Sequence, residues 1–162
     1  MKNFKNNIAK MLMVMSVLFV LSSCKKDQDN VNEGSGKMGT FTYQSNSMDI
    51  KTADYRSGNG DGAWIYLMTK DFNTLQIRFS GLADYVIPIG SFTLKATMPY
   101  DPAKNFKGGQ VIVDNVGDEM TSGTVVVKKS GDKYTITVNA TTAKGPLTGD
   151  FEGAIEKLQI TP

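Results

Sequence analysis

Apolar and polar side chains alternate with a period of two along much of this chain, and this period constrains the fold more than any other feature. One alternating segment has its apolar positions at Tyr134, Ile136, Val138 and Ala140, and another has them at Leu75, Ile77 and Phe79. Successive side chains of a β-strand point to opposite faces, so the pattern is typical of strands with one buried face. The sequence therefore predicts an all-β domain.

Turn-forming residues separate these segments at positions 58–62, 71–73, 130–132 and 144–146. Strands that recur every 8 to 12 residues or so and are joined by hairpins are typical of sandwiches and barrels. We expect about 8–10 strands in an antiparallel β-sandwich or flattened β-barrel. The apolar runs 64–68 and 111–113 predict central strands buried on both faces, and residues 97–108, which contain Pro99 and Pro102, predict a surface loop.

Two glycines fall on the apolar face of a late strand. Gly149 and Gly153 share this face with Leu147 and Phe151. Glycines inside a strand leave space that a large neighbour can fill, and we expect Tyr134 or Trp64 to do so. The alternative is that the space forms a ligand pocket.

Residues 1–23 have the features of a secretory leader. Three lysines, at positions 2, 5 and 10, precede an apolar run from Met11 to Leu21 that contains one serine. This run is too short to span a bilayer, since a transmembrane helix needs about 20 apolar residues. Ser22 and Ser23 follow it, and the next residue is Cys24, the only cysteine of the chain.

The sequence Leu-Ser-Ser-Cys at positions 21–24 resembles the lipobox of bacterial lipoproteins. The resemblance implies that the leader is removed and that Cys24 becomes the lipidated first residue, carrying fatty acids such as palmitate. An ordinary secretory cleavage site and an uncleaved anchor are the alternatives. The chain would then consist of a signal peptide (1–23), a lipidated cysteine with a polar, flexible linker (24–38) and a single all-β domain (39–162).

Several stretches of the domain are similar to small all-β lipoproteins of the Bacteroidota. They are Gly-Thr-Val-Val-Val at 123–127, Ser-Gly-Asp-Lys-Tyr-Thr-Ile-Thr-Val at 130–138 and Leu-Thr-Gly-Asp-Phe-Glu-Gly at 147–153. This resemblance implies a sandwich or flattened barrel and no particular activity. Cys-Lys-Lys-Asp at 24–27 also resembles the export signal of surface-exposed lipoproteins. Together these features predict a lipid-anchored outer-membrane protein, exposed at the cell surface or otherwise facing the periplasm.

Charge and chemistry exclude several functions. The chain has 18 basic and 16 acidic residues, but three of the lysines lie in the leader, which leaves 15 against 16. This balance gives no cationic footprint for nucleic acid.

The chain has no histidine, which excludes Ser-His-Asp catalysis and every His-containing zinc site. The glycine-rich segment 57–62 has Met68 where a calcium loop needs a bidentate Glu, and the acidic residues Asp114, Asp118 and Glu119 predict a solvated turn. We therefore expect no enzyme, no metal and no cofactor.

Aromatic residues are the best candidates for binding. Trp64 and Tyr66 share one face of one predicted strand, and Tyr100 lies in the proline-containing loop. Such rings stack against sugars in glycan-binding modules, although they also dominate the cores of small β-domains. We expect a non-catalytic role in binding a glycan or a surface protein, or a structural role. The alternative is a calycin- or lipocalin-like carrier of a small apolar ligand, which requires a barrel with a hollow interior.

Overall fold

The computed structural model describes residues 37–57, 62–83 and 86–159, and every regular element within these ranges is a β-strand. The strands are β1 (Gly39–Tyr43), β2 (Asn46–Ile50), β3 (Thr52–Ser57), β4 (Ala63–Met68), β5 (Thr74–Phe79), β6 (Gly90–Leu94), β7 (Asn105–Phe106), β8 (Gly108–Val113), β9 (Val116–Ser130), β10 (Lys133–Thr142), β11 (Gly145–Gly153) and β12 (Glu156–Gln159). The predicted all-β fold is confirmed. None of the described residues belongs to a helix that could cross a membrane.

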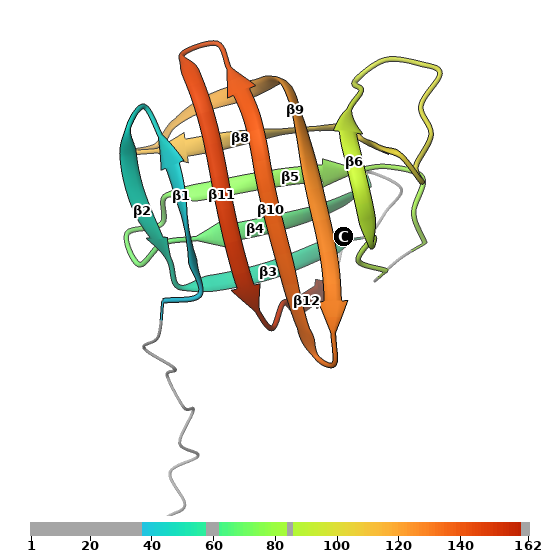
Figure 1. Cartoon of the computed structure of the whole chain (residues 1–162), viewed down its shortest axis with the longest axis horizontal. Helices are drawn as coiled ribbons and strands as arrows, with labels where there is room; N and C mark the ends of the chain where they lie inside the picture. The colour runs from blue at the N-terminus through green and yellow to red at the C-terminus, as the bar shows by residue number, and fades with distance from the viewer. Residues whose placement is uncertain (1–36, 58–61, 84–85, 160–162) are drawn as a thin grey trace, which may run out of the picture. The chain divides into compact units, whose positions relative to one another are not determined.

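One continuous sheet folds over to make two layers. Its strand order is β12-β3-β4-β5-β8-β9-β10-β11-β1-β2, and β6 pairs with the far half of β9. Figure 1 shows β3, β4, β5 and β8 running across the back while β1, β2, β9, β10 and β11 cross in front of them. Neighbouring strands are antiparallel except in the pairs β12–β3 and β6–β7. The result is a half-barrel, in which two layers of the same sheet pack against each other.

The strand β9 forms the corner between the layers. Its first residues, 116–119, pair with β8, and the residues from 120 onward pair with β10. At the change of partner the register slips, so that Thr141 lies opposite Ser122 but Thr142 lies opposite Met120. Gly123 follows with φ of +149°, and a Cβ at this position would lie 2.7 Å from Cα of Ala140. A bulge followed by a glycine allows a strand to turn a corner and continue in a second layer.

The core fills the space between the layers, and the inward positions are those that the alternation indicates. Along β10 the side chains are alternately exposed and buried from Lys133 to Thr142. One contiguous cluster of buried apolar side chains, which includes Phe41, Tyr55, Ile77 and Phe92, connects the two layers. Each such side chain contributes about 1.5–3 kcal/mol when it is removed from water, so the period-two pattern is the main source of stability.

The space at the two inward glycines of β11 is filled by packing, but the nearest side chains do not belong to Tyr134 or Trp64, the expected residues. A Cβ at Gly149 would lie 2.9 Å from Cδ2 of Leu75, which reaches across from the other layer. A Cβ at Gly153 would meet the side chains of Met38 and Phe151. Tyr134 lies directly opposite Gly153 on β10, but the three atoms nearest to a Cβ there belong to Met38 and Phe151. Trp64 cannot fill either space, because it lies on the outer face of the opposite layer.

Two further expectations need correction. The runs 64–68 and 111–113 are not buried on both faces, because Trp64, Tyr66, Met68 and Ile112 are half-buried on the outer face of the back layer. The segment 97–108 is not wholly a loop, because it contains β7 and the first residue of β8. An apolar run in the sequence does not reveal whether a further layer covers the strand, and here the outward half of the run remains partly open to solvent.

The corner at Gly123 gives a test of this fold. The substitution Gly123→Ala should destabilise the domain by about 1–3 kcal/mol, because alanine is strained at this backbone conformation and its Cβ would collide with Ala140. Urea denaturation measures the change. The neighbouring substitution Ser122→Ala, at an exposed position, should stay within about 0.5 kcal/mol of the wild type. Equal midpoints for the two variants would contradict the role given to this glycine.

Candidate functional site

Aromatic and guanidinium side chains gather on the outer face of the back layer. The central strand of this group is β4, which presents Trp64 and Tyr66 outward because Ile65 and Leu67 take the inward positions. Arg56 on β3 lies opposite Trp64 in the register, and so does Arg78 on β5. Cross-strand neighbours on one face are close enough for their side chains to interact. We call these four residues the aromatic–arginine row.

Each member of the aromatic–arginine row contacts the next one, in the order Arg56, Tyr66, Trp64 and Arg78. The guanidinium carbon of Arg56 lies 4.2 Å from the ring centroid of Tyr66, and that of Arg78 lies 5.1 Å from the ring centroid of Trp64. The two rings have their centroids 6.2 Å apart with 35° between their planes. Each cation–π contact stabilises by about 0.5–1 kcal/mol at exposed sites. These contacts favour this arrangement of the rings, and a preorganised arrangement lowers the entropy lost when a ligand binds.

Polar groups fix the edges of the row. Nε and Nη2 of Arg56 each donate a hydrogen bond of 2.9 Å to the carboxylate of Asp54, which is buried. This hydrogen-bonded partner raises the pKa of Arg56, so the guanidinium stays charged. Burial raises the pKa of Tyr66. Beyond β4, Nε2 of Gln110 donates to Oε1 of Gln76 at 2.8 Å. The face thus presents aromatic, amide and paired charged groups.

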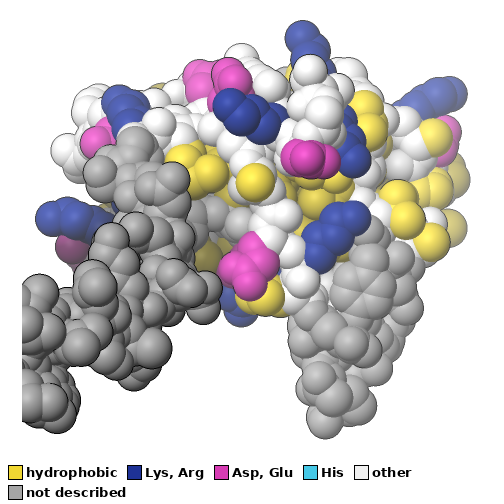
Figure 2. All heavy atoms as spheres, turned by 90° about the horizontal axis from the view of Figure 1, so that it is seen from below, with side chains coloured by type: hydrophobic (Ala, Val, Ile, Leu, Met, Phe, Trp, Pro, Cys, Tyr) yellow, Lys and Arg dark blue, Asp and Glu magenta, His cyan; other side chains and the backbone are white. Residues whose placement is uncertain are grey.

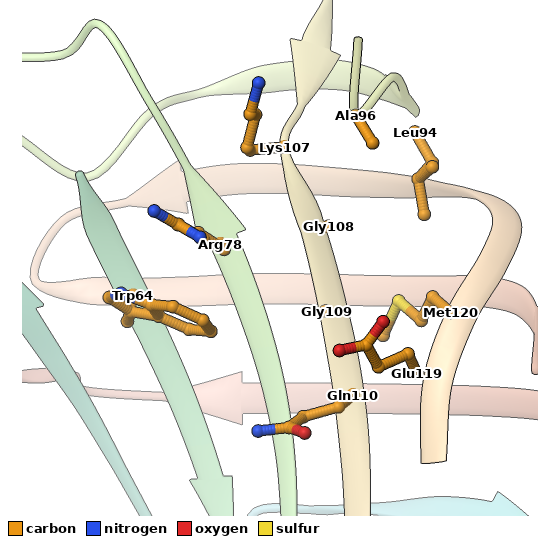
Figure 3. Close-up of a pocket in the computed structure, with 10 residues that line it drawn as sticks. All are labelled: Trp64, Arg78, Leu94, Ala96, Lys107, Gly108, Gly109, Gln110, Glu119 and Met120. Atoms are coloured by element: carbon orange, nitrogen blue, oxygen red, sulfur yellow. The ribbon is translucent and has the colours of Figure 1, made fainter. Parts of the chain in front are cut away.

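A hollow of about 220 Å³ lies at one end of the row, and Figure 3 shows the side chains around it. We call it the Gly108 hollow, and it is lined by Trp64, Arg78, Leu94, Ala96, Lys107, Gly108, Gly109, Gln110, Glu119 and Met120. Its origin is local, since Gly108, at the start of β8 and opposite Arg78, supplies no side chain on this face. A second, more open hollow of about 470 Å³ lies between β2 and the turn that joins β4 to β5.

The three predicted aromatic candidates have different roles. Trp64 and Tyr66 come together as expected, on the outside of the sheet. Tyr100 is half-buried, and its hydroxyl donates to the carbonyl of Asn105 and accepts from the N–H of Ser80. Burial raises the pKa of Tyr100. These hydrogen bonds tie the segment before β7 to the end of β5, so the hydroxyl has a structural role. The predicted lipidation site, Cys24, lies outside the described residues, as do positions 58–61 of the candidate calcium loop.

Sequence reasoning missed the environment of Asp118. The expected solvated turn is wrong for this residue, which is only 7% exposed. Its carboxylate accepts hydrogen bonds from the hydroxyl of Tyr43 at 2.9 Å and from the backbone N–H of Lys144 at 3.2 Å. The turn between β8 and β9 lies at Asp114 and Asn115, which both have positive φ. A single Asp near a turn gives no sequence signal that it faces inward, because its partners are distant in the chain.

Burial is the largest influence on Asp118, and it acts to raise the pKa of the carboxyl. Hydrogen bonds from Thr142, Tyr43 and the Lys144 backbone, together with the charge of Lys144, outweigh it and hold the pKa below its ordinary value. Within the described ranges, no three acidic or cysteine side chains gather into a group that could hold a metal ion. Asp118 therefore joins β1, β9 and the β10–β11 turn as an isolated buried anion.

Charges of both signs are mixed on the surface of the domain. Figure 2 shows basic and acidic side chains interspersed with apolar ones over the face that it presents. Four ion pairs involve described residues, and those other than Asp54–Arg56 join exposed side chains.

No family model, curated protein or solved structure matches this chain.

The buried carboxylate predicts a pH dependence of stability. Because the pKa of Asp118 is lower in the folded chain than its unfolded value of about 3.9, its contribution is fully present above this value. The contribution is lost as the pH falls through the folded pKa. The substitution Asp118→Asn should cost about 1–3 kcal/mol near neutral pH, as expected when buried hydrogen bonds to a charged group are lost.

Thermal melts at several pH values provide the measurement. The difference between wild type and Asp118→Asn should be constant from about pH 5 to 7 and should shrink below about pH 4. Asp132→Asn, in the exposed β9–β10 turn, is the matched control and should melt as the wild type does. A difference that stays constant down to pH 2 would show that the charge of Asp118 contributes nothing.

Proposed function

We propose that this protein is a lipid-anchored, non-catalytic binding protein of the bacterial cell envelope, and that it binds a glycan on the outer face of its back layer. The aromatic–arginine row is the observation that carries the proposal. Sugars present both apolar C–H faces and hydroxyl groups, so they are recognised by aromatic rings with planar hydrogen-bonding groups beside them. Trp64 and Tyr66 supply the rings, and the amide pair of Gln76 and Gln110 supplies hydrogen-bonding groups next to them.

A surface protein is the second candidate ligand. Trp, Tyr and Arg are the residues that most often dominate the energy of protein interfaces, and the row is built from these three types alone. A row held in place by its own contacts suits either ligand, because little side-chain motion is lost on binding. The two candidates differ in area, since a specific protein interface buries about 800 Å² on each partner and a short glycan buries less.

The packed core favours a surface site over the carrier of a small apolar ligand. A carrier needs an interior cavity, usually of about 300–1,000 Å³. The inward positions here are occupied by large side chains that are fully buried, among them Tyr55, Phe79, Phe92, Phe106 and Phe151. Glycines on the inward face of β11 let the two layers approach more closely, and this leaves less room between them.

The proposed location at the outer membrane rests on the leader and on Cys24. Two or more fatty chains anchor a protein stably, whereas a single chain gives only marginal binding at about 0.8 kcal/mol per buried methylene. A lipidated Cys24 followed by a polar linker would hold the β-domain at the outer membrane without inserting it. The charged residues after Cys24 favour display at the cell surface, and an orientation toward the periplasm is the alternative.

The anchor is tested by Cys24→Ser. The variant should move from the membrane fraction to the soluble envelope or medium, because serine provides no thiol for acylation. Ser23→Ala keeps a small residue before the cleavage site and should leave the protein in the membrane fraction. Immunoblots of fractionated cells and the intact mass of the purified protein are the measurements. A membrane-bound Cys24→Ser variant, or a wild-type mass without acyl groups, would refute the anchor.

The binding face is tested by Trp64→Ala. Acylated protein in detergent is titrated with glycans selected from an immobilised panel, and the variant should bind at least tenfold more weakly, which corresponds to about 1.4 kcal/mol. Phe72→Ala is the matched control, because Phe72 is 83% exposed in the β4–β5 turn and lies off this face. Equal affinities for Trp64→Ala and wild type would exclude the row as the site. The absence of any bound glycan, with a protein partner captured instead, would favour the second ligand.

A further inference from the structure

The Gly108 hollow interrupts a cross-strand series of side chains. Trp64 lies opposite Arg78, and Arg78 lies opposite Gly108 on the next strand. Apart from its two chain neighbours, no residue places a heavy atom within 4 Å of a Cβ built at Gly108. The space beside Arg78 is therefore open because this position lacks a side chain, and no residue from another strand fills it. The hollow opens directly next to the indole of Trp64.

Charges are separated within this hollow. Figure 3 shows Arg78 and Lys107 toward one end, Glu119 and Gln110 toward the other, and Leu94, Ala96 and Met120 along a wall opposite Trp64. The two cations can bind an anionic group, and the carboxylate and the amide oxygen can accept hydrogen bonds from hydroxyl groups. An apolar wall facing an indole suits a ring with C–H faces. The lining thus matches a small ligand that is anionic at one end and rich in hydroxyl groups at the other.

Lys107 gives this end of the hollow a positive charge that a ligand can neutralise. Among the described residues, no carboxylate lies within ion-pair distance of Lys107, whose Nζ lies 5.6 Å from the ring centroid of Tyr100. This differs from the other end of the row, where Asp54 already pairs with Arg56. Arg78 has five N–H donors, so it can serve a ligand in addition to its contacts within the fold.

We propose that the Gly108 hollow binds one sugar residue that carries a carboxylate, of the uronic acid type, within a longer glycan. The carboxylate would lie between Arg78 and Lys107, the hydroxyl groups would donate to Glu119 and to the amide oxygen of Gln110, and one C–H face would rest on Trp64. The volume is below the roughly 300–1,000 Å³ of pockets for drug-sized ligands, which suits a single ring. This inference rests on the proposed glycan-binding function and specifies its ligand.

The decisive probe is an oligouronate compared with its methyl ester. Esterification removes the negative charge and keeps the sugar ring and its linkages. We expect acylated protein in detergent to bind oligogalacturonate or alginate oligomers at least tenfold more tightly than the corresponding methyl esters, as measured by isothermal titration calorimetry. The preference should fall as the salt concentration rises, because salt screens charges at an exposed site. The two oligouronates distinguish recognition of the carboxylate from recognition of one particular sugar.

Two variants locate the site. Gly108→Leu should fill the hollow and weaken oligouronate binding at least tenfold, while Thr135→Leu, at an exposed position on the other layer, should leave binding unchanged. Lys107→Gln should reduce the preference for acid over ester, while Lys129→Gln, an exposed lysine on β9, should preserve it. Thermal melts establish that each variant is folded. If Gly108→Leu does not fold, the Lys107→Gln comparison alone decides.

The outcomes separate this inference from the function on which it rests. Equal binding of acid and ester, or unchanged binding by a folded Gly108→Leu variant, overturns the acidic-sugar site even where Trp64-dependent glycan binding persists. In that case the proposed function stands without it. Failure of the wild type to bind any glycan, acidic or neutral, overturns both.

Discussion

The corner in β9 is the constraint on which the rest of this domain depends. A bulge and a glycine at residue 123 let a single sheet pass from one layer to the next while β9 changes its partner from β8 to β10. Because the sheet folds over, every strand has one inward face, and the buried apolar side chains form a single cluster. A flat sheet of the same strands would leave this apolar face in water.

The same folding leaves the outer face of β3, β4, β5 and β8 without a covering layer among the described residues. Large aromatics on such a face would normally be costly to expose, and here they are partly covered by guanidinium groups from the neighbouring strands. Arginine is suited to this role because its planar group can stack on a ring while its N–H groups bind a carboxylate. Arg56 does both, since it lies over Tyr66 and forms a two-point hydrogen bond with Asp54.

Asp118 shows a different use of charge. Its carboxylate joins three segments that are far apart in the chain, and its partners include a tyrosine hydroxyl and a backbone N–H. Such a buried anion is tolerated because charge-assisted hydrogen bonds replace the lost hydration. The row on the outer face and this buried contact are separate features. The binding role of the first is our proposal, and the second stabilises one end of the fold.

The sequence by itself determined the all-β class, the inward and outward positions of β10 and β11, and the pairing of Trp64 with Tyr66 on one face. These features follow from the period of two, which is a local property of extended backbone. Only the tertiary structure decided which face of β4 is covered, what fills the space at Gly149, and where the hollow at Gly108 opens. It also decided that Asp118 is buried. Each of these depends on strands that are distant in the sequence, and local periodicity carries no information about which strands become neighbours.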